Sequence, residues 1–225
     1  INTWQKSGGG NIQARLDAER RAVVKLASTP TARNLVRIFF LQERLKGLGG
    51  KDHGITRVHV VGAGVMGGDI AAWSAYKGFE VTLQDREQRF IDAALTRASE
   101  LFTKKVKDET KRPTVAARLK GDLAGDGVAT ADLVIEAVFE DRAVKAEVIK
   151  KVQAAIGRRT IFASNTSTLP ISSLAENFER QSQFIGIHFF SPVDKMMLVE
   201  IIMGKRTGDR ALATALDFVR AIRKT

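Results

Sequence analysis

The 225-residue sequence contains no cysteine, which excludes a disulfide framework and any metal site built from thiolates. It also contains no apolar run approaching the roughly 20 residues that a membrane-spanning helix needs. The first residues lack the basic start and apolar core of a signal peptide. We therefore expect a soluble, cytoplasmic protein without a transmembrane segment or a metal site.

Acidic residues are outnumbered, since 36 Lys and Arg face 25 Asp and Glu, a net charge of +11. Residues 1–50 hold nine basic and three acidic residues, so +6 of this excess lies there. A basic helical segment of this kind can cover a partner domain, an anionic membrane surface or nucleic acid. Without interleaved aromatic residues or a known nucleic-acid motif, we expect no specific nucleic-acid partner.

A glycine pattern, Gly62-x-Gly64-x-x-Gly67, directly follows the β-branched run 57–61. At a strand-to-helix turn, Gly62 permits the tight turn, Gly64 lets a pyrophosphate approach the backbone, and Gly67 lets the helix pack closely on the strand. The helix that follows offers unpaired N–H groups and the positive end of its dipole to an anion. The pattern predicts a dinucleotide-binding turn.

Asp85 ends a second expected strand, 80–84, about 20 residues beyond the glycines, as the dinucleotide fingerprint requires. A carboxylate there accepts hydrogen bonds from ribose hydroxyls and repels a 2′-phosphate. The sequence therefore favours NAD over NADP, although the neighbouring Arg86 weakens this preference because an arginine can accommodate the extra phosphate.

The chain is long enough for one α/β domain with an appendage. Apolar periodicity predicts two leading helices, 16–27 and 31–46, and then an alternation of strands and helices. The expected strands are 57–61, 80–84, 133–135, 160–163, 184–189 and 197–202. The expected helices between and after them are 65–77, 87–107, 141–156, 171–176 and 209–224. This order predicts a Rossmann-like, doubly wound and mostly parallel sheet preceded by helices.

His188 and Glu200 lie six residues on either side of Asp194, in two apolar runs that flank a turn. If these runs pair antiparallel about that centre, the two side chains fall opposite each other. A carboxylate beside an imidazole orients its tautomer and stabilises the imidazolium that forms after proton abstraction. Next to a dinucleotide, such a pair fits the oxidation of an alcohol. Two further polar groups, 135–141 and 163–168, follow expected strands at the same sheet edge.

The sequence contains four motifs that together identify a known family. In chain order they are Gly-Ala-Gly-Val-Met-Gly-Gly, Ile-Glu-Ala-Val-Phe-Glu-Asp, Ser-Asn-Thr-Ser-Thr-Leu-Pro-Ile, and His-Phe-Phe-Ser-Pro-Val with Leu-Val-Glu-Ile-Ile. They resemble the NAD-binding domain of L-3-hydroxyacyl-CoA dehydrogenases over about residues 56–225. The stretch from Lys25 to Arg44 resembles the helices that link the enoyl-CoA hydratase part to the dehydrogenase part in multifunctional β-oxidation enzymes. The domain division that follows is a helical linker over 1–55 and the NAD-binding domain over 56–225.

The resemblance implies NAD-dependent oxidation of L-3-hydroxyacyl-CoA to 3-oxoacyl-CoA. His188 and Glu200 would form the catalytic pair, and Ser167 would meet both the nicotinamide and the substrate. Lys105 would meet the phosphates of coenzyme A. The residues that would contact NAD are Gly62, Gly64, Met66, Gly67, Asp85, Val138, Phe139, Glu140, Lys145, Ser167 and Ser191.

Relatives of this kind continue into a helical domain that closes the acyl site and often mediates dimer contacts. We therefore expect this chain to bind NAD but to turn over 3-hydroxyacyl-CoA poorly or not at all. The partners implied are an acyl-CoA substrate, a hydratase domain, a thiolase subunit and, in the full-length protein, a second copy. Two alternatives remain open: a non-catalytic nucleotide-binding or docking module, and a β-hydroxyacid dehydrogenase that uses a lysine base.

Overall fold

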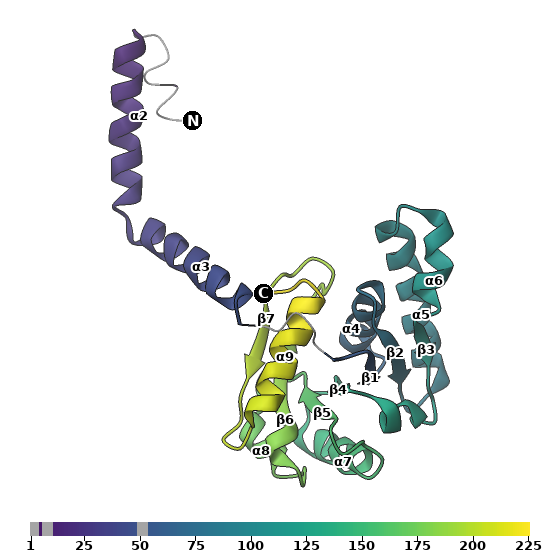
Figure 1. The fold of residues 1–225 in the computed structure, drawn as a ribbon. Helices are drawn as coiled ribbons and strands as arrows, with labels where there is room; N and C mark the ends of the chain where they lie inside the picture. Colours follow the sequence, from purple (N-terminus) through teal and green to yellow (C-terminus); the bar gives the residue numbers. More distant parts are fainter. Residues whose placement is uncertain (1–4, 6–10, 49–53) are drawn as a thin grey trace. The chain divides into compact units, whose positions relative to one another are not determined.

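A computed structural model describes residues 5, 11–48 and 54–225 of the chain (Figure 1). The chain separates into two compact units, residues 1–48 and 49–225. The helical linker over 1–55 and the NAD-binding domain over 56–225 remain predictions as functional domains.

The first unit contains two helices, α2 (Ile12–Ala27) and α3 (Pro30–Lys46). Each begins at a side-chain cap, because Asn11 accepts a hydrogen bond from the Ala14 N–H and Thr29 accepts one from the Ala32 N–H. α2 begins four residues before the expected position, where Asn11 supplies this cap. Both helices expose large apolar side chains, among them Phe39 and Phe40 on α3.

The second unit is built on one seven-stranded sheet. Its strands are β1 (Arg57–Val61), β2 (Glu80–Gln84), β3 (Leu119–Gly121), β4 (Leu133–Glu136), β5 (Ile161–Ser164), β6 (Phe184–Phe189) and β7 (Val199–Ile202). They lie in the order β3-β2-β1-β4-β5-β6-β7. All neighbouring pairs are parallel except β6 and β7, which are antiparallel. The expected doubly wound, mostly parallel sheet is confirmed.

Helices cover both faces of this sheet (Figure 1). They are α4 (Val65–Tyr76), α5 (Gln88–Lys105), α6 (Arg112–Ala116), α7 (Arg142–Gln153), α8 (Ile171–Ala175) and α9 (Asp209–Ala221). Alternate residues of a strand enter opposite cores. In β4, Leu133 and Ile135 pack in the cluster that includes α4, α5 and α9, whereas Val134 packs in the cluster that includes α7 and α8. Strands that are buried on both faces explain the continuous apolar runs of the sequence.

The segment between α5 and β4 departs from the sequence prediction. No element was expected there, but the structure contains α6, the edge strand β3 and two 3₁₀ helices, Glu109–Lys111 and Asp126–Thr130. A three-residue strand is too short to produce an alternating pattern, so periodicity could not find it. β7 also begins at Val199, two residues later than predicted. Within the described part of the chain, no helix combines the length and the apolar composition that a membrane span requires.

Candidate functional site

The turn between β1 and α4 carries the three glycines, and each meets a different steric limit. Gly62 has a φ of +104°, and a Cβ there would lie 2.7 Å from the carbonyl oxygen of Ala137. A Cβ on Gly67 would overlap the carbonyl oxygen of Gly62. A Cβ on Gly64, in contrast, would meet nothing within 4 Å beyond its chain neighbours, and the first turn of α4 has no side-chain cap. Free N–H groups beside open space fit a bound phosphate.

Asp85 directly follows β2, beside this turn. Its Oδ2 accepts a hydrogen bond of 2.6 Å from the Ala63 N–H, and its Oδ1 accepts one of 2.8 Å from the Arg86 N–H. The carboxylate is therefore fixed against the glycine turn, where a ribose adjoining the pyrophosphate would lie. Met66 is half-buried in the first turn of α4 and packs against the core.

His188 and Glu200 face each other across β6 and β7, as their spacing predicted. The strand register pairs these two residues, and the imidazole Nδ1 lies 2.9 Å from Glu200 Oε2. The His188 side chain is 13% exposed and that of Glu200 is 50% exposed. The carboxylate thus reaches solvent on one side while its partner is largely enclosed.

The other imidazole nitrogen, Nε2, lies 3.0 Å from the hydroxyl oxygen of Ser167. When Nδ1 donates to the Glu200 carboxylate, Nε2 carries the lone pair and accepts from the serine hydroxyl. This is the tautomer in which Nε2 can act as a base. Ser167 lies beyond the carboxyl end of β5, so segments from three neighbouring strands converge here.

Glu140 holds the turn that presents Ser167. A single oxygen, Oε1, accepts hydrogen bonds from the Ser167 and Thr168 N–H groups and from the Thr166 and Thr168 hydroxyls, at 2.6–3.1 Å. Burial alone would raise the pKa of Glu140. The hydrogen bonds from Thr166, Thr168 and Ser167, with the charge of Lys145, outweigh that effect and lower the pKa to about 2. Glu140 is therefore a carboxylate at any physiological pH.

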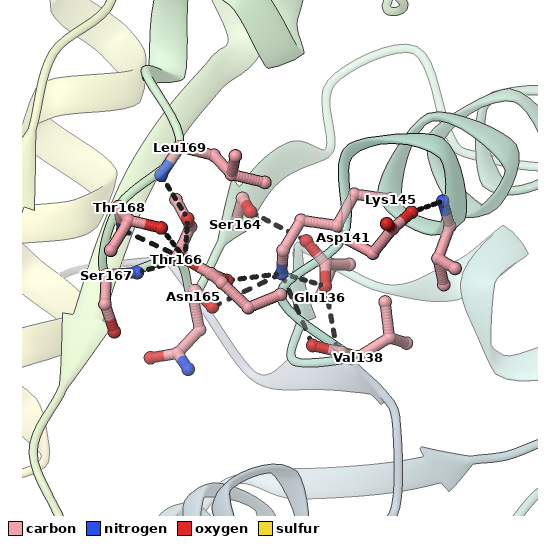
Figure 2. Close-up of polar contacts among 12 residues, drawn as sticks. Glu136, Val138, Asp141, Lys145, Ser164, Asn165, Thr166, Ser167, Thr168 and Leu169 are labelled. Atoms are coloured by element: carbon pink, nitrogen blue, oxygen red, sulfur yellow. Dashed lines mark hydrogen bonds and ion pairs between the residues drawn. The ribbon is translucent and has the colours of Figure 1, made fainter.

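Lys145 was expected to line the cofactor, but its side chain is fully buried. Its Nζ donates to Glu136 Oε1 at 2.8 Å and approaches the carbonyl oxygens of Val138 and Asn165 (Figure 2). Glu136, the last residue of β4, is also fully buried; it belongs to the polar group 135–141, but the sequence assigned it no role of its own. The sequence offered one signal for this pair, namely a charged residue at the end of an apolar strand with a lysine nine positions later.

The remaining expected cofactor contacts differ in accessibility. Val138 is half-buried, Phe139 is 78% exposed, and Ser191 is exposed on the loop between β6 and β7. Phe139 and Ser191 are exposed enough to contact a ligand, but exposure does not identify which ligand they contact. The roles of Val138, Phe139 and Ser191 therefore stay predictions.

A cavity of about 300 Å³ lies between α4, α5 and the β6–β7 loop. Charged side chains line it: Asp69, Arg97, Glu100, Lys104, Asp194 and Lys195. Lys105, the expected coenzyme A contact, makes an ion pair of 3.0 Å with Asp194 Oδ2. Burial alone would raise the pKa of Asp194, but the hydrogen bond and charge of Lys105 lower it. Lys105 thus holds the β6–β7 loop, while Lys104 lines the cavity. The sequence pattern did not predict that Asp194 pairs with Lys105.

Known proteins are similar to this chain in architecture and in sequence. The chain is 36% identical to the fatty acid oxidation complex subunit alpha of Colwellia psychrerythraea, over the whole chain and 32% of that relative. It is 34% identical to the solved (S)-3-hydroxybutyryl-CoA dehydrogenase of Ralstonia eutropha, with a TM-score of 0.70 over 76% of this chain and 62% of that one. The dehydrogenase part of multifunctional enzyme 1 from C. elegans is 32% identical, with a TM-score of 0.67 over 76% of this chain and 40% of that one.

The chain therefore spans about a third of the length of this curated relative and less than two thirds of these solved structures. The family described as 3-hydroxyacyl-CoA dehydrogenase, NAD binding domain, matches residues 57–225. This range contains the glycine turn, Asp85 and the His188–Glu200 pair. The cofactor of this domain is NAD, and the chain belongs to the family of 3-hydroxyacyl-CoA dehydrogenase NAD binding domains.

Proposed function

We propose that this chain is the NAD-binding part of an enzyme that oxidises the hydroxyl group of an L-3-hydroxyacyl-CoA to a ketone. The proposal depends on the two contacts of the His188 imidazole, one with Glu200 and one with Ser167. They lie at the edge of the sheet that also carries the glycine turn. The names of the relatives, a fatty acid oxidation subunit and a 3-hydroxybutyryl-CoA dehydrogenase, support this substrate class.

In this proposal, His188 Nε2 removes the hydroxyl proton of the substrate. Glu200 accepts the Nδ1 hydrogen bond and stabilises the imidazolium that results. Without substrate, the lone pair of Nε2 accepts from the Ser167 hydroxyl. With substrate bound, that hydroxyl would donate to the reacting oxygen instead and hold it beside Nε2. The glycine turn and Asp85 would hold NAD, which would supply the hydride acceptor that the two-electron oxidation of the carbinol carbon needs. Lys105, with Lys104 and Lys195 of the neighbouring cavity, would meet the phosphates of coenzyme A; the same cavity is also lined by Asp69, Glu100 and Asp194.

The proposal extends to the surroundings of the domain. The whole-chain similarity to a subunit of a fatty acid oxidation complex supports partners within such a complex. We propose a hydratase domain and a thiolase subunit as these partners, and a cytoplasmic location. The exposed apolar side chains of α2 and α3 fit the role of a linker between enzyme parts.

Calorimetry on the 225-residue chain tests the cofactor step. We expect NAD to bind and NADP to bind more weakly, because the Asp85 carboxylate repels a 2′-phosphate. Asp85→Asn should lower NAD affinity about tenfold or more, since hydrogen bonds to charged groups contribute roughly 1.5–3 kcal/mol. Asp92→Asn removes the same charge from an exposed position of α5 and serves as the matched control. Absence of NAD binding by the unmodified chain would refute the proposal.

The base is tested in the enzyme that contains this domain, by the absorbance of the reduced nicotinamide formed from a 3-hydroxyacyl-CoA. Loss of a general base lowers the rate about 10²–10⁴-fold, and we expect His188→Gln to lower the rate of NAD reduction by a factor in this range. Activity that survives this change would favour a lysine base instead.

A further inference from the structure

The buried ion pair of Glu136 and Lys145 lies between the loop after β4 and the turn after β5. Both side chains are fully buried. Glu136 uses both oxygens, because Oε1 accepts from Lys145 Nζ and the Val138 N–H while Oε2 accepts from the Ser164 hydroxyl. Removing two charges from water costs free energy that their attraction barely offsets, so such a pair contributes little stability. Its placement calls for a role other than stability.

Lys145 joins the two loops. Its ammonium lies 3.4 Å from the carbonyl oxygen of Val138 in the loop after β4, and 3.5 Å from that of Asn165 in the turn after β5 (Figure 2). It also lies 3.5 Å from Glu140 Oε2, the carboxylate oxygen that the threonine and serine donors leave free. One buried cation therefore ties together loops that follow two neighbouring parallel strands.

These contacts continue to the reacting side chain. Glu140 Oε1 binds the backbone N–H of Ser167, whose hydroxyl contacts His188 Nε2. Asn165 reaches the same strand separately, because its Oδ1 accepts from the N–H of Phe189, the neighbour of His188. The path from Glu136 through Lys145, Glu140 and Ser167 to His188 is continuous in polar contacts.

We propose that Glu136 is a positioning residue for the reaction: by anchoring Lys145 it fixes Glu140 and the 166–168 turn, which keeps the Ser167 hydroxyl on His188 Nε2. The inference rests on the proposed function, in which that nitrogen is the base. It gives Lys145 a part in holding the loops from within.

The test is the nitrogen NMR signal of His188 Nε2 in the 225-residue chain without NAD, at about pH 8, where an ordinary histidine is neutral. The chain has three histidines, and the signal of His188 is identified by its loss in His188→Gln. Ser167→Ala should move the Nε2 signal toward that of an unbonded imidazole. Glu136→Gln should move it at least half as far, and combining both changes should move it no further than Ser167→Ala alone.

Ser164→Ala is the matched control. It removes the hydrogen bond to Glu136 Oε2 but leaves the contact with Lys145, so it should lower the melting temperature and leave the Nε2 signal in place. An unchanged Nε2 signal in folded Glu136→Gln, or displacements that add in the double variant, would overturn the proposal.

A second variant guards against a folding defect in Glu136→Gln. The combination of Glu136→Gln with Lys145→Met removes both charges at similar volume. The glutamine oxygen keeps an acceptor for the Val138 N–H, and its amide NH2 can donate to the hydroxyl oxygen of Ser164. We expect it to fold with the Nε2 signal displaced. If neither variant folds, the pair serves stability and the proposal is wrong. Because NAD is absent from these samples, a failure of the positioning role is distinguished from a failure of NAD binding, which calorimetry measures.

Discussion

His59 is a buried histidine, and its surroundings contrast with those of the partly exposed His188. It lies in β1 with no exposed surface; its Nδ1 is 2.8 Å from the Thr82 hydroxyl and its Nε2 is 3.1 Å from Gln84 Oε1. Burial lowers its pKa below the ordinary 6.5, although Gln84 and the charge of Asp122 oppose this shift. The amide oxygen of Gln84 requires a donor, so the neutral ring carries its proton on Nε2. His59 is therefore a structural group of the sheet, whereas His188 faces the site.

This difference predicts a pH dependence of stability. Below pH 6.5 the unfolded chain binds a proton at His59 that the folded chain does not, so the free energy of unfolding should fall as pH decreases from 6.5 toward the folded pKa. His59→Gln should flatten this slope in urea unfolding measured across that interval. A ring NMR titration of His59 with a midpoint at or above 6.5 in the folded chain would contradict the prediction.

At the scale of elements, the β1–α4 turn combines two requirements that the sequence pattern does not separate. Gly67 is needed for packing, because the backbone of Gly62 occupies the place of a Cβ. Gly64 has a negative φ of −59° and open surroundings, so the fold itself tolerates a side chain there. We therefore expect the bound ligand, rather than the fold, to require a glycine at position 64.

Two alanine substitutions test this division. Gly67→Ala should lower the free energy of unfolding by about 1–3 kcal/mol, as overpacking does. Gly64→Ala should leave stability within about 0.5 kcal/mol of the unmodified chain. It should nevertheless weaken NAD binding about tenfold, roughly 1.4 kcal/mol. Thermal unfolding and calorimetry measure the two effects, and a large loss of stability in Gly64→Ala would show that the turn is sterically full.

At the scale of the whole molecule, the residues of the proposed site all belong to the unit 49–225. The helices α2 and α3 form the other unit and expose apolar side chains such as Leu35 and Phe39. Exposed apolar side chains of this kind are typical of helices that pack against another protein surface, so we expect α2 and α3 to contact another part of an enzyme rather than the cofactor.

Removing the first unit should therefore spare the cofactor site. A chain comprising residues 54–225 should bind NAD within about twofold of the 225-residue chain, less than about 0.5 kcal/mol. Calorimetry on both chains measures this, with Asp85→Asn in the shorter chain as the control for specific binding. Loss of NAD binding on truncation would assign α2 or α3 a part in the site.

Much of the candidate site follows from local pattern. The glycine spacing, the β-branched run of β1 and the strand end at Asp85 are determined by steric and hydrogen-bonding rules that act over a few residues. The opposition of His188 and Glu200 follows from symmetry about a turn, since antiparallel strands pair residues equidistant from their centre. The short edge strand β3 escaped prediction because three residues carry no period.

Spacing along single segments was enough to predict the main strands and helices, the glycine turn and the histidine–glutamate pair, but not α6 or β3. The contacts of Lys145 with Glu136, Val138 and Asn165, and of Lys105 with Asp194, could not be predicted in this way. These contacts join residues from different strands and loops, and the burial that selects a partner for each charge exists only after the sheet and its helices have packed.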